Sequence, residues 1–434
     1  MGLTTPNQVD ELNPRTNEFE FGGILGALGI TITVPIFTYL LNLSCQPIVG
    51  GKLNSFETIS KIQEVWNETR LFSHEGFNLY FCWYIYMVLC WAILPGRFVQ
   101  GTVLRNGDRL TYKINAFATL ILTIFLIGTI FWRFGQWPFL YVIDHYFEII
   151  TASLIMSILQ ATYCYWSSFR TGKLLALGGN SGNFLYDWFI GRELNPRVLN
   201  ESFDIKTFNE MRPGLILWVV LNFCWSIKQI QNFGKLSNSM VLCFLFHFWY
   251  VFDAEYNEDT ILTQMDITTD GFGFMLSVGD LTWVPFTYSL QLVYLAFVDV
   301  KLSNMQILII IGVQMIGYHI FRTSNEEKNN FRHKFQNPKA LKFIETERGT
   351  KLLTSGWWGR SRHPNYFGDW IMSWAWCLPT GFGTPVTYFY VIYFGILLIH
   401  RQIRDEDSCE KKYGKEDWNR YKKIVPWKII PYIY

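Results

Sequence analysis

Long apolar runs separated by short polar loops constrain this chain more than any other feature. The first run, FGGILGALGITITVPIFTYLL at 21–41, contains no charged residue. A helix of that length spans the hydrocarbon core of a bilayer. Half of the residues are hydrophobic and only 17% are charged, which is more apolar than an average soluble domain. The sequence therefore predicts an integral membrane protein.

The runs predict an all-α, polytopic fold with about ten transmembrane helices in one membrane domain over residues 1–434. Several runs are shorter than the roughly 20 residues of a straight span, so their ends are approximate and tilted or re-entrant segments are allowed. The polar segment 1–21 precedes the first span. The predicted spans are 22–41, 79–94, 114–131, 147–165, 214–227, 240–252, 272–297, 307–321, 366–382 and 386–399.

The positive charges predict the orientation of these spans. With ten spans and a cytosolic N-terminus, both termini are cytosolic, and four of the five cytosolic segments after the first span are basic: 96–113, 166–213, 322–365 and the tail after His400. This asymmetry follows the positive-inside rule. The fifth segment, 253–271, is acidic. A formal net charge of only +2 disfavours a nucleic-acid partner.

Cysteine and histidine do not predict a metal site. Most of the eight cysteines lie in apolar runs, where a thiol behaves as a small hydrophobic group. His363, in SRHPNY, has no second ligand at zinc spacing.

Carboxylates next to apolar sequence are candidates for function. Glu255, Glu258 and Asp259 are expected in water, in an acidic loop. Asp266, Asp270 and Asp280 are interleaved with apolar residues. For each of them, the sequence predicts a polar cavity or a structural ion pair about as strongly as it predicts exposure to water.

The loop 328–365 and the tail 404–421 share a composition that suits a nucleotide. Each combines cations for phosphates, aromatic rings for stacking, and acids or amides for hydrogen bonds. The alternative is positive charge that only sets membrane orientation, with no ligand.

Two long motifs carry a resemblance to a known family. GNSGNFLYDWFIGRELNPR at 179–197 and LLIHRQIRDEDSCEKKYG at 397–414 resemble the two characteristic motifs of the sterol reductases. The pieces DITTDGFGFML, GWWGRSRHPNYFGDW and VPWKIIPYIY are most similar to fungal members that act on the C14=C15 double bond. The likeness covers nearly the whole chain.

The resemblance implies an NADPH-dependent reductase of the endoplasmic reticulum membrane in ergosterol biosynthesis. Its substrate is a sterol 8,14-diene taken from the bilayer, and its neighbours are membrane lipid, with other sterol-biosynthesis enzymes as candidate partners. The cofactor would bind on the cytosolic side of the C-terminal part, 322–434. The residues that the resemblance assigns to the NADPH pocket are Lys328, Arg332, Leu353, Trp358, Asn365, Tyr366, Asp405, Cys409, Glu410, Lys411, Lys412, Tyr413 and Tyr421.

The chemistry of the implied reaction requires an acid as well as a hydride donor. An alkene without an electron-withdrawing group is not an electrophile, so protonation at C15 must create a cation at C14 before hydride adds. We expect Tyr250, with Asp266 or Asp270 as an acidic partner, to supply that proton. The alternative for Tyr250 is packing at the membrane interface.

Three other functions remain open from the sequence. The same fold could reduce the Δ7 or Δ24(28) double bond of a sterol. RHPNY followed by an acidic, tyrosine-rich tail is also similar to isoprenylcysteine-type membrane methyltransferases, which are shorter. The third alternative is a sterol-binding scaffold without enzymatic activity.

Overall fold

The computed structural model describes residues 11–50, 56–333 and 341–434. The chain forms two compact units. The first contains the described residues up to Leu236 and the segment Phe244–Asp299, and the second contains Ser237–Cys243 and the described residues from Val300 to Tyr434. The prediction of a single domain stays a prediction, because compactness alone does not establish that either unit folds by itself.

The predicted all-α, polytopic architecture is confirmed. Among the described residues, seven helical segments are long and apolar enough to cross a membrane. They correspond to seven of the ten predicted spans. Five are the helices α2 (Gly23–Ser44), α4 (His74–Ile93), α5 (Ala116–Phe134), α7 (Tyr146–Ser167) and the segment Ile205–Phe233, and the other two are Asn304–Arg332 and Val386–Tyr413.

The other three predicted spans do not meet the combined criteria of length and composition. The run 240–252 lies on α11 (Asn238–Tyr256), and the run 366–382 lies on the shorter α17 (Pro364–Cys377) and η4 (Leu378–Thr380). The run 272–297 is divided into short helices, one of which has Pro285 in its first turn, where a missing backbone N–H is tolerated. These are α13 (Phe274–Val278), η3 (Gly279–Trp283), α14 (Val284–Thr287) and α15 (Leu290–Leu295).

Shorter helices complete the described chain, and the segments Ile205–Phe233 and Val386–Tyr413 each combine several elements. The first consists of α9 (Ile205–Asn209), η1 (Glu210–Gly214) and α10 (Leu215–Phe233), and the second of η5 (Val386–Tyr388) and α18 (Phe389–Tyr413). The spanning segment Asn304–Arg332 lies on α16 (Asn304–His333). The remaining helices are α3 (Phe56–Glu68), α6 (Trp137–Asp144), α8 (Phe184–Ile190), η2 (Glu258–Thr263), α12 (Met265–Thr268) and α19 (Lys415–Ile424).

Three short antiparallel hairpins, counted over the described residues, are a feature that the helical prediction did not include. They are β1 (Arg97–Val103) with β2 (Arg109–Ile114), β3 (Arg197–Val198) with β4 (Phe203–Asp204), and β5 (Phe343–Glu345) with β6 (Lys351–Leu353). Each hairpin lies in one of the predicted cytosolic loops, except that β2 ends at Ile114, the first residue of the predicted span 114–131. This placement fits a membrane protein, since an open strand edge in lipid would leave backbone groups unpaired.

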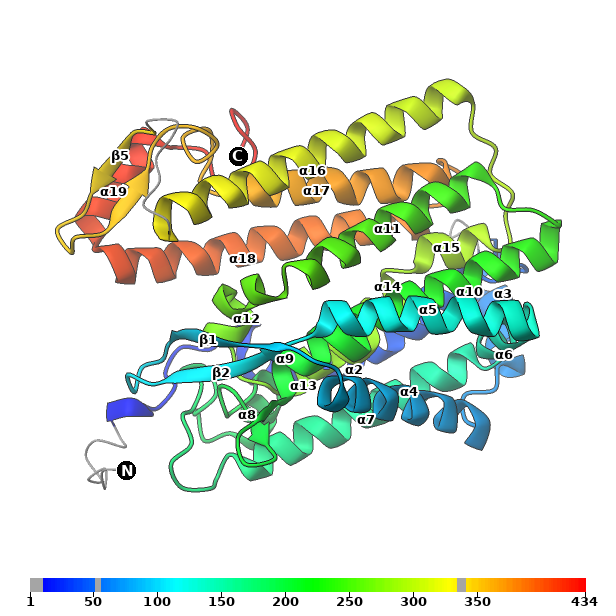
Figure 1. The fold of residues 1–434 in the computed structure, drawn as a ribbon, viewed down its shortest axis with the longest axis horizontal. Helices are drawn as coiled ribbons and strands as arrows, with labels where there is room; N and C mark the ends of the chain where they lie inside the picture. The colour runs from blue at the N-terminus through cyan, green and yellow to red at the C-terminus, as the bar shows by residue number, and fades with distance from the viewer. Residues whose placement is uncertain (1–10, 51–55, 334–340) are drawn as a thin grey trace. The chain divides into compact units, whose positions relative to one another are not determined.

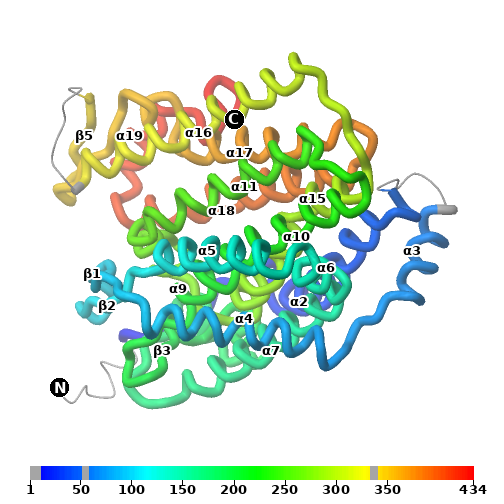
Figure 2. The backbone as a smooth tube through the Cα atoms, turned by 45° about the vertical axis from the view of Figure 1, so that its right-hand side comes forward, coloured from blue at the N-terminus to red at the C-terminus, as the bar shows by residue number. Residues whose placement is uncertain are grey.

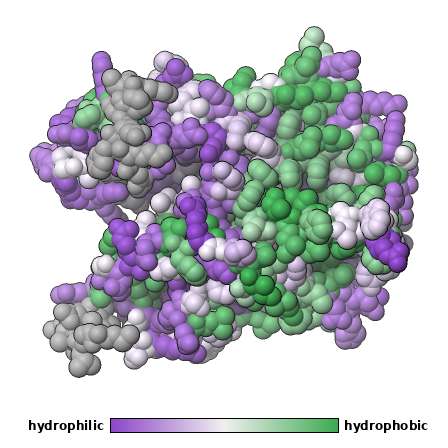
Figure 3. Space-filling model, viewed as in Figure 1, coloured by the Kyte–Doolittle hydropathy of each residue, from purple (hydrophilic) through white to green (hydrophobic). Residues whose placement is uncertain are grey.

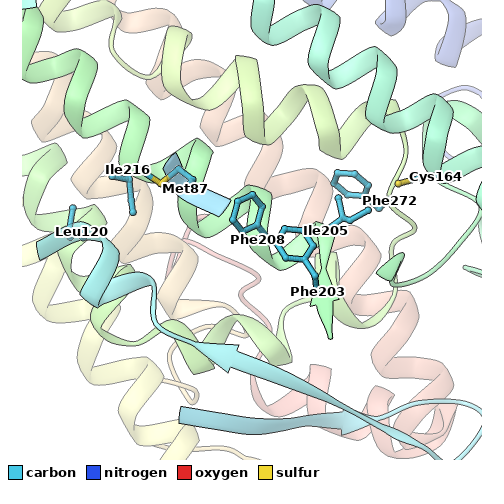
Figure 4. Packing of buried hydrophobic residues seen from close by; sticks show 8 residues of the cluster. All are labelled: Met87, Leu120, Cys164, Phe203, Ile205, Phe208, Ile216 and Phe272. Atoms are coloured by element: carbon cyan, nitrogen blue, oxygen red, sulfur yellow. The ribbon is translucent and has the colours of Figure 1, made fainter. Parts of the chain in front are cut away.

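Aromatic and aliphatic side chains form the core of the first unit. A buried cluster joins α4, α5, α7, α9 and α10 to the loop that contains Phe272 (Figure 4). Apolar residues gather over α5 on the face drawn in Figure 3, whereas polar residues cover the β1–β2 hairpin of the same unit. The cluster consists of Met87, Leu120, Cys164, Phe203, Ile205, Phe208, Ile216 and Phe272.

The described part of the polar N-terminal segment is docked on a later loop of the same unit. Thr16 Oγ1 donates a 2.6 Å hydrogen bond to the carbonyl of Leu177 and accepts one of 2.9 Å from the backbone N–H of Asn180. Asn13 Oδ1 accepts a 2.9 Å hydrogen bond from the N–H of Leu175. The residues just before the first span are therefore held by defined contacts.

In the second unit, α16 and α17 lie side by side (Figure 1; Figure 2). Their backbones approach at two glycines. A Cβ atom on Gly317 would lie 2.8 Å from the carbonyl oxygen of Gly368. Only a residue without a side chain allows helices to pack this closely.

Candidate functional site

Cations and aromatic rings meet near the C-terminal end of α16. Lys328 Nζ lies 4.3 Å from the centre of the Trp358 ring, a distance typical of a cation–π contact. The indole N–H of Trp358 donates a 2.9 Å hydrogen bond to the carbonyl of Ser324, which fixes the ring against α16. Lys328 and Trp358, both assigned to the predicted pocket, therefore contact each other in the structure.

Arg332, one turn further along α16, contacts α18. Its guanidinium donates a 2.9 Å hydrogen bond to the hydroxyl of Tyr413. Tyr413 and Tyr421 are both buried in an aromatic cluster with Trp418 and Leu352. The hydroxyl of Tyr421 donates to the carbonyl of Trp358 over 3.3 Å. Burial raises the pKa of Tyr421, so that hydroxyl keeps its proton.

The start of α17 meets α18 through a second polar group. Tyr366 donates a 2.6 Å hydrogen bond to Asp405 Oδ2, and the Tyr366 ring stacks on His363 at 4.9 Å between centroids. His363 Nδ1 lies 3.8 Å from the same carboxylate oxygen. Burial, together with the positive charges of Lys328 and Arg362, lowers the pKa of His363 to about 3, so the ring is neutral at pH 7.

The remaining predicted pocket residues lie nearby, with different surroundings. Leu353 is buried on β6, and Cys409 packs against the aromatic cluster. Lys412 Nζ lies 5.4 Å from the Tyr413 ring centre. Two residues make contacts away from the rings: Glu410 pairs with Lys422 at 3.7 Å, and the carbonyl of Lys411 accepts a 2.7 Å hydrogen bond from Arg348.

The residues present fit a phosphate-bearing, aromatic ligand such as NADPH. Cations and indole and phenol rings are collected in one unit, as such a ligand requires. Two buried polar atoms near them, His363 Nε2 and Asn365 Oδ1, have no hydrogen-bond partner among the described residues. Buried polar groups are normally paired, so these atoms are available to a ligand.

The site also depends on residues that the sequence did not single out. Glu327 accepts a 2.9 Å hydrogen bond from the N–H of Trp357, and its carboxylate lies against Gly356, whose φ of 68° favours glycine. Arg362 is hydrogen-bonded to Glu406 and to the carbonyls of Val425 and Pro426. No local pattern distinguishes these residues from other charged loop residues.

The predicted proton donors lie in the first unit. Tyr250 is half-buried on α11, with its ring 6.2 Å from the Trp218 ring. Asp270 is buried and Asp266 is half-buried. Lys206 Nζ donates 2.6 Å hydrogen bonds to the backbone carbonyls of both aspartates, which ties them to α9.

The prediction that Glu255 and Glu258 lie in water is wrong. Glu255 is 1% exposed and Glu258 is 4% exposed. Arg212, distant in sequence, forms a 3.0 Å ion pair with Glu258, whose second oxygen accepts a hydrogen bond from the N–H of Ala116. Asp259 is less buried and pairs with Arg97 at 2.9 Å.

The first of the two long motifs has a structural explanation. The Asp187 carboxylate accepts hydrogen bonds from the N–H groups of Ser181 and Gly182, both at 2.9 Å, which closes the loop before α8. Gly191 has a φ of 98°, and a Cβ there would collide with the backbone of Gly271–Gly273. The motif at 179–197 thus positions the loop that carries Asp270.

Fold and site together define a polytopic membrane protein with a C-terminal cluster of cations and aromatic rings. A model of the ergosterol biosynthesis ERG4/ERG24 family matches residues 15–434, and the chain belongs to this family. The Delta(14)-sterol reductase erg24 of Schizosaccharomyces pombe is 48% identical over 421 residues, which cover 96% of this chain and 97% of that protein. The Delta(14)-sterol reductase ERG24 of Saccharomyces cerevisiae is 46% identical over 448 residues, covering 98% and 100%. The Candida albicans protein of the same name is 43% identical over 454 residues, covering 98% and 99%.

Proposed function

We propose that this chain is a Δ14-sterol reductase, which reduces the C14=C15 double bond of a sterol 8,14-diene in ergosterol biosynthesis. The observation that carries the proposal is similarity along nearly the full length of the chain to fungal proteins with that name. The Δ7 and Δ24(28) reductions and the methyltransferase activity have no such support. We therefore do not retain them as candidate functions.

NADPH is the proposed cofactor, and it supplies a hydride when bound. Lys328 and Arg332 lie one helical turn apart and hold phosphate charge, while Lys412 adds a third cation. Trp358 and Tyr413 offer ring surfaces, and Asn365 and Asp405 offer hydrogen-bond acceptors. Leu353, Cys409 and Tyr421 complete the packing, with Tyr366 orienting Asp405. Glu410 and Lys411 are also assigned to the proposed NADPH site.

Tyr250 is the proposed proton donor to C15, with Asp266 or Asp270 as its acidic partner. Protonation uses the electron pair of the C14=C15 bond and leaves a tertiary cation at C14, which then accepts hydride. The apolar surroundings of α11 exclude water, which would otherwise quench such a cation. The sterol enters from the bilayer.

The proposed location is the endoplasmic reticulum membrane, with both termini cytosolic. The short hairpins and the C-terminal cations fall in segments predicted to be cytosolic, which is the side where a soluble cofactor is available. Membrane lipid surrounds the apolar helices, and other enzymes of sterol biosynthesis are candidate partners.

The proposal is tested with purified protein in detergent, NADPH and a sterol 8,14-diene. We expect the 8-ene as product, with one NADPH oxidised per sterol reduced. Lys328→Met should weaken NADPH binding, whereas the exposed Lys342→Met should not. If no NADPH is oxidised and S-adenosylmethionine binds instead, the reductase proposal is wrong.

A further inference from the structure

A buried carboxyl oxygen without a hydrogen-bond partner among the described residues lies in α17, next to the proposed cofactor residues. Asp369 is 9% exposed, and its Oδ1 has no partner among the residues that the structure describes. The charged group that acts on it is Arg401 of α18, through electrostatic attraction. A buried acceptor without a partner costs free energy, so its retention calls for an explanation.

The other carboxylates around the site already have partners. Asp405 accepts from the hydroxyl of Tyr366, and Glu406 accepts from Arg362. Glu327 accepts from the N–H of Trp357, and Asp417 accepts from the N–H of Glu347. In the described part of this unit, Asp369 is thus the acid whose acceptor is left for a ligand.

Asp369 lies on the same face of α17 as Asn365, whereas the cations that suit phosphates lie on α16. Asp369 follows Asn365 by four residues, so the two side chains share a face and lie about 6 Å apart along the helix axis. Asn365 Oδ1 is also unpartnered. Lys328 and Arg332, which suit phosphates, lie on α16 beside Trp358 and Tyr413.

The residues on either side of Asp369 in α17 are uncharged, and the cation that acts on Asp369 is Arg401 of α18. Gly368, the residue before it, packs directly against the backbone of α16 at Phe321. Trp370, the residue after it, donates a 3.1 Å hydrogen bond to the carbonyl of Val391 on α18. An acceptor in such a place suits an uncharged N–H donor on a flat ring better than a phosphate, which a carboxylate would repel.

We propose that Asp369 is a further cofactor-binding residue, whose Oδ1 accepts a hydrogen bond from the carboxamide NH₂ of the nicotinamide ring. This inference rests on the proposed use of NADPH. The contact fixes the rotation of the ring, and with it the face that is presented to the sterol.

The test compares two ligands that differ only at the proposed donor. Reduced 3-acetylpyridine adenine dinucleotide phosphate carries a methyl group where NADPH carries the amide NH₂. Wild-type protein should bind NADPH about 10- to 100-fold more tightly than this analogue, measured by calorimetry. Asp369→Ala should bind both with similar affinity, because the acceptor is gone. Asp369→Asn keeps an acceptor oxygen and should retain most of the preference.

Two controls separate a lost contact from a damaged fold. Binding of 2′-phospho-ADP-ribose, which lacks the nicotinamide ring, should be unchanged in Asp369→Ala. Asp407→Ala, which removes an exposed acid on α18, should behave as wild type. An undiminished preference for NADPH in Asp369→Ala would overturn the inference, and so would loss of 2′-phospho-ADP-ribose binding in both Asp369 variants, which would indicate a structural role. If the wild-type protein binds neither NADPH nor 2′-phospho-ADP-ribose, the proposed function itself fails.

Discussion

Tyr366 donates a 2.6 Å hydrogen bond to Asp405 Oδ2 and thereby joins the first turn of α17 to α18. His363 stacks on the same tyrosine and approaches the same carboxylate oxygen at 3.8 Å. This group lies in the unit that also holds Lys328 and Arg332. The contact between Tyr366 and Asp405 therefore orients one of the proposed acceptors for NADPH.

Tyr366→Phe should weaken NADPH binding about 10-fold, because a hydrogen bond to a charged group is lost while the ring remains. Binding calorimetry measures the effect. Tyr432→Phe is the matched control, since Tyr432 is 82% exposed. In a cycle with Asp405→Asn, the two effects should not add, because they act on one contact. Full additivity would show that Tyr366 acts independently of Asp405.

Tyr250→Phe should lower turnover of the sterol diene about 100-fold and leave NADPH binding unchanged, because it removes a proton donor but keeps the ring that packs near Trp218. Tyr256→Phe on the same helix is the control, since that side chain is 66% exposed. Product formation and NADPH titration are measured in parallel. Undiminished turnover would remove Tyr250 from the mechanism.

Lowering the pH from about 7 to about 5 should lower the melting temperature of the protein, in part through His363. The pKa of His363 is about 3 in the folded chain, against 6.5 as its ordinary value. Below about pH 6.5 the unfolded chain therefore binds a proton that the folded chain does not, and stability falls by up to about 1.4 kcal/mol per pH unit. The nearby Asp405 favours the charged ring, but burial and two cations outweigh it.

His363→Phe should flatten this pH dependence, because a phenyl ring stacks on Tyr366 without titrating. His74→Phe, which removes an exposed histidine, should retain the slope of the wild type. Thermal unfolding in detergent across this pH range measures both. Equal slopes for all three proteins would show that His363 does not contribute.

Gly191→Ala should destabilise the protein by about 2–4 kcal/mol, because a Cβ would meet the backbone of Gly271–Gly273 and the φ of 98° disfavours a side chain. Gly178→Ala, in the same loop region, is the control, since a Cβ there meets open space. Melting temperatures of the two variants are compared. If the Gly191→Ala protein is as stable as the wild type, the backbones of Gly191 and Gly271–Gly273 can move apart with little loss of stability.

Hydropathy predicted the helical segments well, but it could not predict how they end or break. Seven predicted spans coincide with helices that can cross a membrane among the described residues. The run 272–297 is also apolar, yet it forms several short helices. Hydropathy measures the preference of a segment for lipid, whereas its breaks depend on Pro285 and on packing against α10, which composition does not record.

The sequence by itself determined a helical membrane protein, because that class depends on hydropathy. Its resemblance to a known family also indicated C-terminal residues for a cofactor site, of which Lys328 and Trp358 contact each other. Only the tertiary structure decided how individual polar groups are paired. Glu258 is buried because Arg212 reaches it, and Asp369 Oδ1 is buried without a hydrogen-bond partner among the described residues. Such partners come from segments distant in sequence, so burial and pairing of a polar side chain follow from packing rather than from local pattern.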